Sequence, residues 1–237
     1  MSQTLHFIEP NSLAFPPLNQ ALEEPNGLLA FGGDLSPQRL YNAYSHGIFP
    51  WYSANEPIMW WSPNPRAIIP TSTVKINKTL KKILNRHSFQ VSINRCFDHV
   101  IELCADAPFR SDSTWIVTDM LDAYKALHQQ GHAHSIEVWQ DDKLVGGLYG
   151  VAINGYFSGE SMFYKASNAS KVALVALAKL LKEIDVEFID CQMTNPFLED
   201  MGCIEISRAT FVKYLTKAKC VAVPSHFWQA RYLSEIR

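Results

Sequence analysis

The sequence lacks the features that mark exported, membrane-spanning or thiol-based metal proteins. Its five cysteines are widely spaced and form no C-x-x-C pair, which argues against a zinc ribbon or a thioredoxin-type site and favours free thiols in a reducing compartment. No apolar run approaches the roughly 18 residues needed to cross a bilayer. Residues 1–10 contain no Lys or Arg, so we expect no secretory signal. These absences predict a cytoplasmic protein with no membrane partner.

Glycine-rich catalytic motifs are also missing. The chain has no P-loop, no G-x-G-x-x-G and no G-x-S-x-G, which disfavours P-loop NTPases, Rossmann enzymes and serine hydrolases of the nucleophile-elbow type. His132 and His134 could place two ligands on one strand face, but no third ligand lies nearby in the sequence. We therefore expect neither a metal nor a cofactor.

The composition is that of a folded protein of one large or two small domains. The chain has 237 residues, of which 47% are apolar and 19% charged, with a net charge of −2. Ten of the 13 prolines lie in the first 70 residues, where regular structure should be short. One helix is nevertheless predicted there, because Ser36 can cap it, Pro37 suits its first position and Gly47 ends it.

Beyond residue 70 the pattern changes to longer helices and strands, which places a domain boundary near residues 66–70. Asn154-Gly155 predicts a hairpin between two of these strands. We predict helices near 78–87, 96–104, 118–130, 168–184 and 207–218, and strands near 89–93, 134–140, 144–153, 156–160 and 187–192. The order of these elements indicates an α+β fold with a mixed sheet.

Positive charge is concentrated in part of the chain. No Asp or Glu occurs from residue 57 to 97, and a second acid-free run covers 207–234. Four cations recur at helical spacing and could form one face that contacts phosphates. These are Lys78, Lys81, Lys82 and Arg86, with Arg66 upstream. The alternative is an ordinary solvated helix surface, and charge alone does not separate the two.

Three side chains are candidates for chemistry. Asp190 and Gln192 lie two apart on a predicted strand and should share one face, with Cys191 on the other. An Asp in an otherwise apolar strand needs hydrogen-bond partners, so a structural role is the simpler alternative. Glu160 follows another strand and could equally be a loop carboxylate. Trp51 and Trp115 could stack on a base or pack in a core.

Several ordered motifs carry a resemblance to a known family. They include Gly32-Gly-Asp-Leu-Ser36, Gly47-Ile-Phe-Pro-Trp51, Trp60-Trp-Ser-Pro-Asn-Pro-Arg66, Gly131-His-Ala-His-Ser135, Gly159-Glu-Ser-Met-Phe163 and Ile189-Asp-Cys-Gln192. Each motif alone is weak, but the ordered set covers nearly the whole chain. Together they resemble bacterial leucyl/phenylalanyl-tRNA–protein transferases.

The resemblance implies a fold and an activity. It implies a small proline-rich α/β domain over residues 1–66, which contributes to the site for the 3′ end of the tRNA, and a GNAT-like acyltransferase domain over 67–237. The implied reaction moves Leu or Phe, and to a lesser extent Met, from tRNA to an acceptor protein that begins with Arg or Lys. The acceptor then enters the N-degron degradation pathway. The implied partners are Leu-tRNA, Phe-tRNA and these acceptors, and the enzyme is expected to be a monomer.

The resemblance also implies roles for individual residues. The catalytic centre falls on Asp190 and Gln192, with Glu160 beside it. The terminal adenosine would be held by Trp51 and Trp115. The apolar pocket for the aminoacyl side chain falls on Leu148, Phe157, Gly159, Leu177, Leu181 and Ile189. The cations that would contact the tRNA backbone are Arg66, Lys78, Lys81, Lys82 and Arg86.

Elementary chemistry fits these roles. The aminoacyl ester is already activated and an α-amine has a pKa near 8, so positioning supplies most of the rate. Gln192 would accept a hydrogen bond from the amine, Asp190 would hold Gln192 and favour the developing ammonium, and Glu160 would position the cationic end of the acceptor. The stretch Asn195–Gly202 departs from the family pattern, so Phe197 and Asp200 receive no role.

Two alternatives stay open at this point. An acetyl-CoA N-acetyltransferase would need a glycine-rich loop before the helix near 168–184, and residues 163–170 contain no Gly. A non-catalytic tRNA-binding protein would explain the basic stretches and the tryptophans, but not an Asp and a Gln on a strand beside an apolar pocket.

Overall fold

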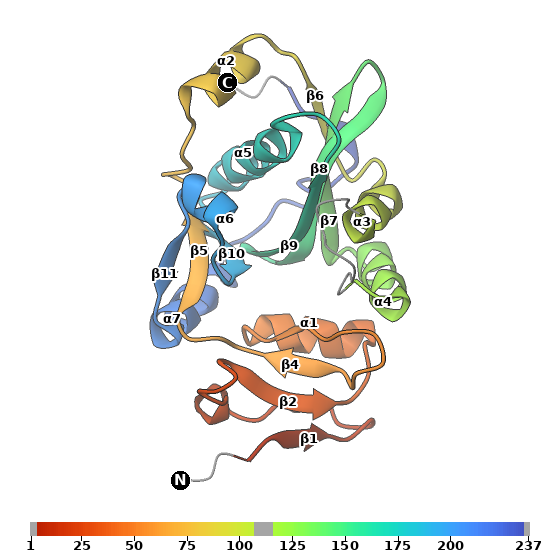
Figure 1. Ribbon diagram of the computed structural model, residues 1–237, viewed down its shortest axis with the longest axis vertical. Coiled ribbons are helices and arrows are strands. Elements are labelled where there is room, and N and C mark those ends of the chain that lie inside the picture. Colours follow the sequence, from red (N-terminus) through yellow and green to blue (C-terminus); the bar gives the residue numbers. More distant parts are fainter. Residues whose placement is uncertain (1–3, 107–115, 235–237) are drawn as a thin grey trace.

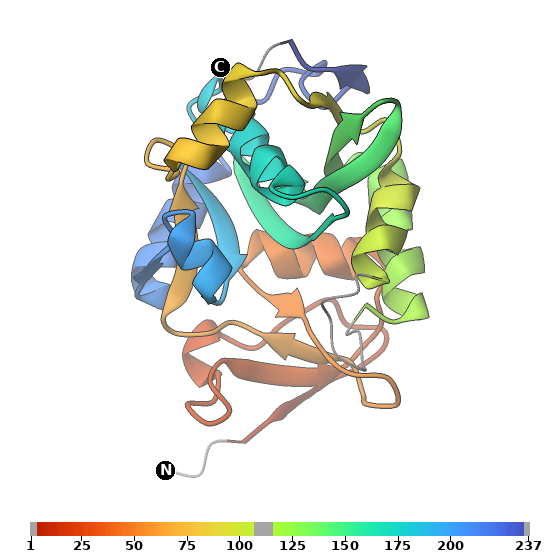
Figure 2. The same ribbon diagram turned by 45° about the horizontal axis from the view of Figure 1, so that its top comes forward.

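The computed structural model describes residues 4–106 and 116–234, whose strands form two sheets. The small N-terminal sheet contains β1 (His6–Ile8), β2 (Leu28–Gly32), β3 (Phe49–Pro50) and β4 (Met59–Trp61), in the order β1-β2-β4-β3. Helix α1 (Pro37–Ser45) lies between this sheet and the rest of the chain (Figures 1 and 2). A short 3-10 helix, η1, covers Leu18–Gln20.

The second sheet has eight strands in the order β11-β5-β10-β9-β8-β7-β6-β12. The strands are β5 (Arg66–Pro70), β6 (Gln90–Ile93), β7 (Ala133–Gln140), β8 (Lys143–Ile153), β9 (Tyr156–Tyr164), β10 (Phe188–Gln192), β11 (Ile204–Ile206) and β12 (Arg231–Tyr232). All neighbours pair antiparallel except β9 and β10, which are parallel. This mixed sheet, with its helices, confirms the predicted α+β class.

Helices cover both faces of the large sheet. Helices α3 (Phe97–Ala105) and α4 (Thr118–Gln129) pack with α1 and α7 (Arg208–Ala218) around one apolar cluster. Helices α2 (Lys78–Asn85), α5 (Ala169–Lys182) and α6 (Pro196–Asp200) surround the other. Strand β8 supplies Tyr149 and Val151 to the first cluster and Leu148 and Ala152 to the second, as the alternation of a strand requires.

The predicted elements beyond residue 70 are all present, with ends shifted by a few residues. The main difference is β9, which continues to Tyr164 instead of ending at residue 160. Local signals act as expected: the Ser36 side chain accepts a hydrogen bond from the backbone N–H of Arg39, and Pro37 opens α1. Asp141 and Asp142, between β7 and β8, both have positive φ, as a type I′ turn requires.

Short elements were missed by sequence analysis. The proline-rich region contains strands β1 to β4, and β5 starts at Arg66, directly after two prolines in the sequence Pro63-Asn-Pro65. Helix α6 and strand β11 lie between β10 and α7 where no element was predicted. Each spans five residues or fewer, which is too short for a hydrophobic period to be read.

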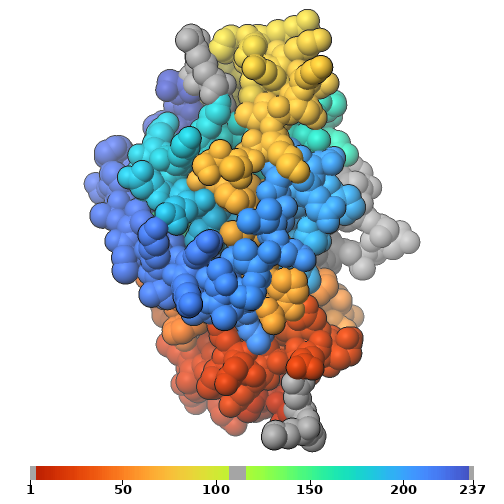
Figure 3. Space-filling model, turned by 90° about the vertical axis from the view of Figure 1, so that its left-hand side faces the viewer, coloured from red at the N-terminus to blue at the C-terminus, as the bar shows by residue number. Residues whose placement is uncertain are grey.

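Figure 3 shows how the chain is distributed from end to end: α2 projects at one end of the molecule, and the N-terminal region forms the other. Helix α2 packs against α5. Within the described residues, no helix combines the length and the apolar character needed to span a bilayer.

Candidate active site

A pocket opens where strands β9 and β10 separate. The two strands share a single register pair, Ser158 with Asp190. Beyond that pair, β9 contributes Gly159 to Met162 and Tyr164 to the pocket wall, and β10 contributes Cys191 and Gln192. Ile189, which comes just before the pair on β10, also lines the pocket. The pocket has a volume of about 670 Å³, within the range of small-molecule sites. The pocket therefore occupies the space between β9 and β10 where the two strands are no longer paired.

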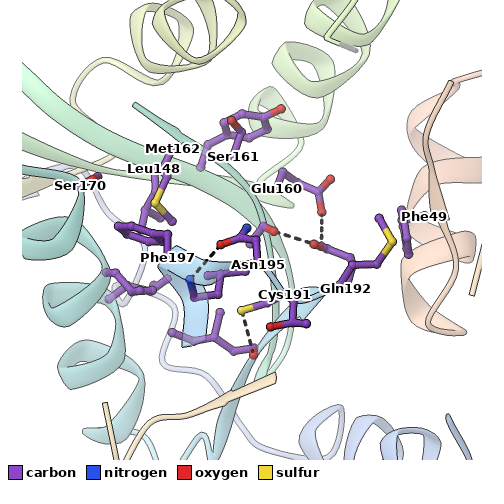
Figure 4. A pocket seen from close by; sticks show the side chains of 18 of the residues that line it. Phe49, Leu148, Glu160, Ser161, Met162, Ser170, Cys191, Gln192, Asn195 and Phe197 are labelled. Atoms are coloured by element: carbon purple, nitrogen blue, oxygen red, sulfur yellow. Dashed lines mark hydrogen bonds between the residues drawn. The ribbon is translucent and has the colours of Figure 1, made fainter. Parts of the chain in front are cut away.

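The pocket wall is largely apolar. Helix α5 presents Ser170, Leu174 and Leu177, which are spaced three and four residues apart and so share one face. Leu148 lies across the pocket on β8, and Phe197 comes from α6 (Figure 4). The Glu160 carboxylate and the Gln192 amide lie together at one side of the pocket (Figure 4). Such a pocket suits an apolar side chain attached to a polar reacting group.

Four of the six predicted pocket residues line this cavity, and two do not. Leu148, Gly159, Leu177 and Ile189 are in the wall. Phe157 is buried, with its ring centroid 5.7 Å from that of Trp228, and Leu181 is buried one turn beyond Leu177 on α5. These two assignments are corrected: both side chains belong to the core behind the pocket rather than to its surface.

Asp190 is buried and fully occupied by partners. Its carboxylate receives two hydrogen bonds from Arg66, at 2.8 Å from Nε and 2.7 Å from Nη2. The Tyr156 hydroxyl donates at 2.5 Å, and the backbone N–H of Gln192 at 3.1 Å. Because Asp190 is 0% exposed, it cannot touch a substrate. The expected electrostatic effect of Asp190 on a developing ammonium would therefore act at a distance, without contact.

Arg66 is a structural cation and not a phosphate ligand. It is 0% exposed; Nη1 donates to the Gly47 carbonyl oxygen at 3.1 Å and the guanidinium lies 4.4 Å from the centre of the Phe211 ring. Burial tends to lower the pKa of Arg66, but Asp190 raises it and holds it above the usual value. The prediction that Arg66 contacts the tRNA backbone is wrong, because no phosphate can reach it.

Gln192 sits in a strained turn at the pocket edge. Its φ is +58°, and the backbone N–H of Met193 bonds to the Cys191 carbonyl oxygen at 2.7 Å, closing a three-residue turn. A register shift between Asp190 and Gln192 breaks the strand alternation there. Cys191 consequently also lines the pocket, contrary to the alternation argument. Strain at a non-glycine residue is typical of functional positions.

The side-chain amide of Gln192 has a defined orientation. Its Nε2 donates to the Ser158 hydroxyl at 2.7 Å, the Gly159 carbonyl oxygen at 3.0 Å and Glu160 Oε1 at 3.2 Å. The amide oxygen is thereby directed away from these acceptors. Gln192 can thus offer a hydrogen-bond acceptor to a ligand in the pocket.

Glu160 is partly buried and surrounded by hydroxyl groups. Tyr124 donates to its Oε2 at 3.2 Å and Ser158 to its Oε1 at 3.0 Å, while the Tyr44 and Tyr124 hydroxyls lie 2.5 Å apart. Burial raises the pKa of Glu160 to about 7, although these hydrogen bonds to the ionised form oppose the rise. Its charge consequently changes near neutral pH.

The predicted nucleic-acid contacts fall in two places. Trp51 lines the pocket and is 39% exposed, with its ring centroid 5.5 Å from that of Trp61. Trp115 lies outside the described residues. The cations of α2 and its C-cap residue are all exposed, at the end of the molecule where Figure 3 shows α2: Lys78, Lys81, Lys82 and Arg86.

Sequence reasoning missed Ser158, Tyr156 and Leu174. Leu174 could have been found, since it lies three residues before Leu177 on the same helix face. Ser158 and Tyr156 gave no signal, because their roles arise from contacts to residues more than thirty positions away. The same holds for the partnership of Arg66 with Asp190, across 124 residues.

Comparison with known sequences identifies closely similar proteins. A family model described as "Leucyl/phenylalanyl-tRNA protein transferase" matches residues 68–216, and one for the N-terminal domain of the same family matches 33–64. A leucyl/phenylalanyl-tRNA--protein transferase of Colwellia psychrerythraea is 59% identical over the whole of both chains. One of Tolumonas auensis is 47% identical over 98% of this chain and 99% of its own.

Solved structures give weaker matches. L-PGS from Bacillus licheniformis matches 70% of this chain and 53% of its own, with 12% identity and a TM-score of 0.39. A GCN5-related N-acetyltransferase from Kribbella flavida matches 70% and 60%, with 9% identity and a TM-score of 0.37. These values are too low to bear on the function.

Proposed function

The chain belongs to the leucyl/phenylalanyl-tRNA protein transferase family and is an aminoacyltransferase, and we propose that its pocket at the β9–β10 separation is where the aminoacyl group is transferred. The donor is aminoacyl-tRNA carrying Leu or Phe, and the acceptor is a protein. We further propose that acceptors begin with Arg or Lys, that transfer marks them for N-degron degradation, and that the enzyme acts as a cytoplasmic monomer.

The donor end would occupy the pocket in two parts. The leucyl or phenylalanyl side chain would enter between α5 and β8, against Leu177 and Leu148, where desolvation disfavours polar side chains. The terminal adenosine would lie at the mouth against Trp51, whose ring is partly exposed beside that of Trp61. We propose that Trp115 also contacts this adenosine.

The reaction needs orientation more than strong acid–base chemistry. The α-amine of the acceptor attacks the ester carbonyl carbon, the bond to the ribose oxygen breaks, and that oxygen takes up a proton as the tRNA leaves. Gln192 would accept a hydrogen bond from the amine through Oε1 and align its lone pair with the carbonyl. Positioning of this kind contributes on the order of several kcal/mol. The single observation that carries this role is the hydrogen-bonded orientation of the Gln192 amide.

Asp190 and Glu160 would support this centre differently. Asp190 is a positioning residue that fixes the backbone of Gln192 from within the core. Glu160 reaches the pocket and is charged above pH 7, so it can attract the cationic N-terminal end of an acceptor. Equal acceptor affinity in Glu160→Gln would count against this role of Glu160.

The rest of the tRNA would contact α2. Its exposed cations form a face suited to phosphates, and α2 packs on α5, whose inner face lines the pocket. We keep the proposed division into residues 1–66 and 67–237, which assigns the Trp51 side of the mouth to the first domain and Gln192 to the second.

A transfer assay tests the proposal. Radiolabelled Leu-tRNA or Phe-tRNA is mixed with peptides that begin with Arg, Lys or Asp but are otherwise identical, and acetyl-CoA is offered in parallel. We expect label on the Arg and Lys peptides only. Label that stays on tRNA while acetyl-CoA is consumed would assign the chain to the acetyltransferases, and binding of tRNA without any transfer would make it a binding protein.

A further inference from the structure

Ser158 connects all three residues assigned to the reaction centre. It is 0% exposed and forms the one register pair between β9 and β10, opposite Asp190. Its hydroxyl oxygen lies 2.7 Å from Gln192 Nε2, 3.0 Å from Glu160 Oε1 and 3.5 Å from Asp190 Oδ2. A glycine on the neighbouring strand makes room here, because a Cβ on Gly150 would lie 2.2 Å from the Ser158 carbonyl oxygen.

The Ser158 hydroxyl has only one proton to donate, which limits how its neighbours can be oriented. A serine hydroxyl carries one proton and two lone pairs, and an ionised carboxylate only accepts hydrogen bonds. Ser158 therefore gives its proton to a carboxylate, and Glu160 is the nearer one. Toward Gln192, Ser158 can then only accept. The amide must point its NH2 group at Ser158, and its carbonyl oxygen at the pocket.

We propose that Ser158 is a positioning residue that selects the orientation of the Gln192 amide, so that Oε1 and not the NH2 group faces the attacking amine. This inference rests on the proposed function. A flipped amide would place Oε1 against the Gly159 carbonyl oxygen and Glu160, which are both acceptors, and would present a donor to a nucleophile that has no use for one.

The selection depends on the charge of Glu160, since a protonated carboxyl can itself donate to Ser158 or to a flipped amide. The groups that face Glu160 are Tyr44 from α1, Tyr124 from α4, Ser158 on its own strand, and Gln192 and Asp190 from β10. Burial raises the pKa of both tyrosines well above their usual value, so they stay protonated donors. Asp190 is paired with Arg66. The pKa of Glu160 is raised by burial to about 7, so its charge changes near neutral pH.

The test is a double-mutant cycle under single-turnover conditions, with Phe-tRNA and a peptide that begins with Arg. Activity of the unmodified enzyme is measured first, so failure of the proposed function is recognised separately. We expect Ser158→Ala to lower the transfer rate on the order of 10-fold, with donor and acceptor affinities within about 2-fold. In a Gln192→Ala background the same change should have no further effect, because Ser158 acts through Gln192.

Two further variants make the result specific. Ser158→Cys leaves no gap at the γ position but offers only a weak acceptor, so it should be slow like Ser158→Ala even if the alanine variant folds poorly. Ser62→Ala is the matched control, because Ser62 is buried and its hydroxyl has no hydrogen-bond partner within the described residues.

The pH–rate profile gives a further readout. Ser158→Ala removes a hydrogen bond to ionised Glu160 and so raises the pKa of Glu160. The rising limb of the profile should therefore move to higher pH, by roughly half a pH unit or more.

An equal loss from Ser158→Ala in the wild-type and Gln192→Ala backgrounds would overturn the inference, as would full activity of Ser158→Ala or Ser158→Cys. A loss carried entirely by weaker donor binding would also overturn it, since it would make Ser158 part of the pocket wall only.

Discussion

Glu160 links the pocket to pH. The structure raises its pKa from 4.5 to about 7, so the folded protein binds this proton more tightly than the unfolded chain does. Stability contributed by this group is therefore lost as pH rises from about 4.5 to 7, by about 3 kcal/mol at 1.36 kcal/mol per pKa unit.

Glu160→Gln should remove that loss. The free energy of unfolding is measured by urea titration for both proteins. The value for the variant minus the value for the wild type should increase as pH rises from 5 to 8, because the amide carries no charge to desolvate. Parallel stability curves for the two proteins across this range would show that Glu160 is not desolvated as described.

Arg66 and Asp190 form a buried pair whose members depend on each other. Arg66→Met should destabilise the protein by about 3–5 kcal/mol, because it leaves the Asp190 carboxylate charged and without its main partner in the core. Chemical denaturation measures this loss. The double variant Arg66→Met/Asp190→Asn should be more stable than Arg66→Met alone, and a single-variant loss below about 1 kcal/mol would contradict the account.

At the scale of elements, helix α5 contributes some residues to the pocket wall and others to the core. Leu177 lines the pocket and Leu181, four residues on, does not, although both are buried. Each Leu→Ala change should cost about 2–5 kcal/mol of stability. Only Leu177→Ala should alter donor choice, raising the kcat/KM ratio of Phe-tRNA over Leu-tRNA on the order of 10-fold, since the larger side chain fills the widened pocket.

The matched pair makes this prediction specific. Competition between Phe-tRNA and Leu-tRNA gives the ratio directly, and it should stay within about 2-fold of wild type in Leu181→Ala. An equal shift in both variants would mean that general loosening of α5, and not the pocket wall, sets the preference.

Helix α2 is predicted to supply phosphate contacts. Lys81→Gln/Lys82→Gln should weaken tRNA binding and reduce the slope of log affinity against log salt concentration by roughly 2, about one for each lost contact. The matched control is Lys213→Gln/Lys217→Gln on α7, another basic helix that packs elsewhere (Figure 1). A fluorescence titration at several salt concentrations measures the slopes, and equal effects from both helices would remove the special role of α2.

At the scale of the whole molecule, the sequence predicted the elements that carry a long hydrophobic period. Helix α5 and hairpin β8–β9 were predicted because their signals are local: an apolar face around Leu177, and Asn154-Gly155 at the turn. The N-terminal sheet was not, because its strands have two to five residues among prolines and are defined by pairing with distant strands.

The site follows the same division. Gln192 and Glu160 were predicted as neighbours, and the structure brings them to 3.2 Å. The burial of Arg66 was not predictable, since an arginine in an acid-free stretch is normally exposed, and its partner Asp190 lies on another strand. The turn at Gln192 was also not predicted, because strand alternation assumes a regular backbone and φ of Gln192 is positive.

The central claim is that Gln192 orients the acceptor amine at the pocket between β9 and β10. The most direct test is single-turnover transfer of Phe from tRNA by the wild type and by Gln192→Ala, with donor affinity measured on the same samples. We predict that the chemical step slows on the order of 100-fold while donor affinity changes less than about 2-fold. An unchanged rate of transfer in Gln192→Ala would contradict the claim and place the reaction centre elsewhere.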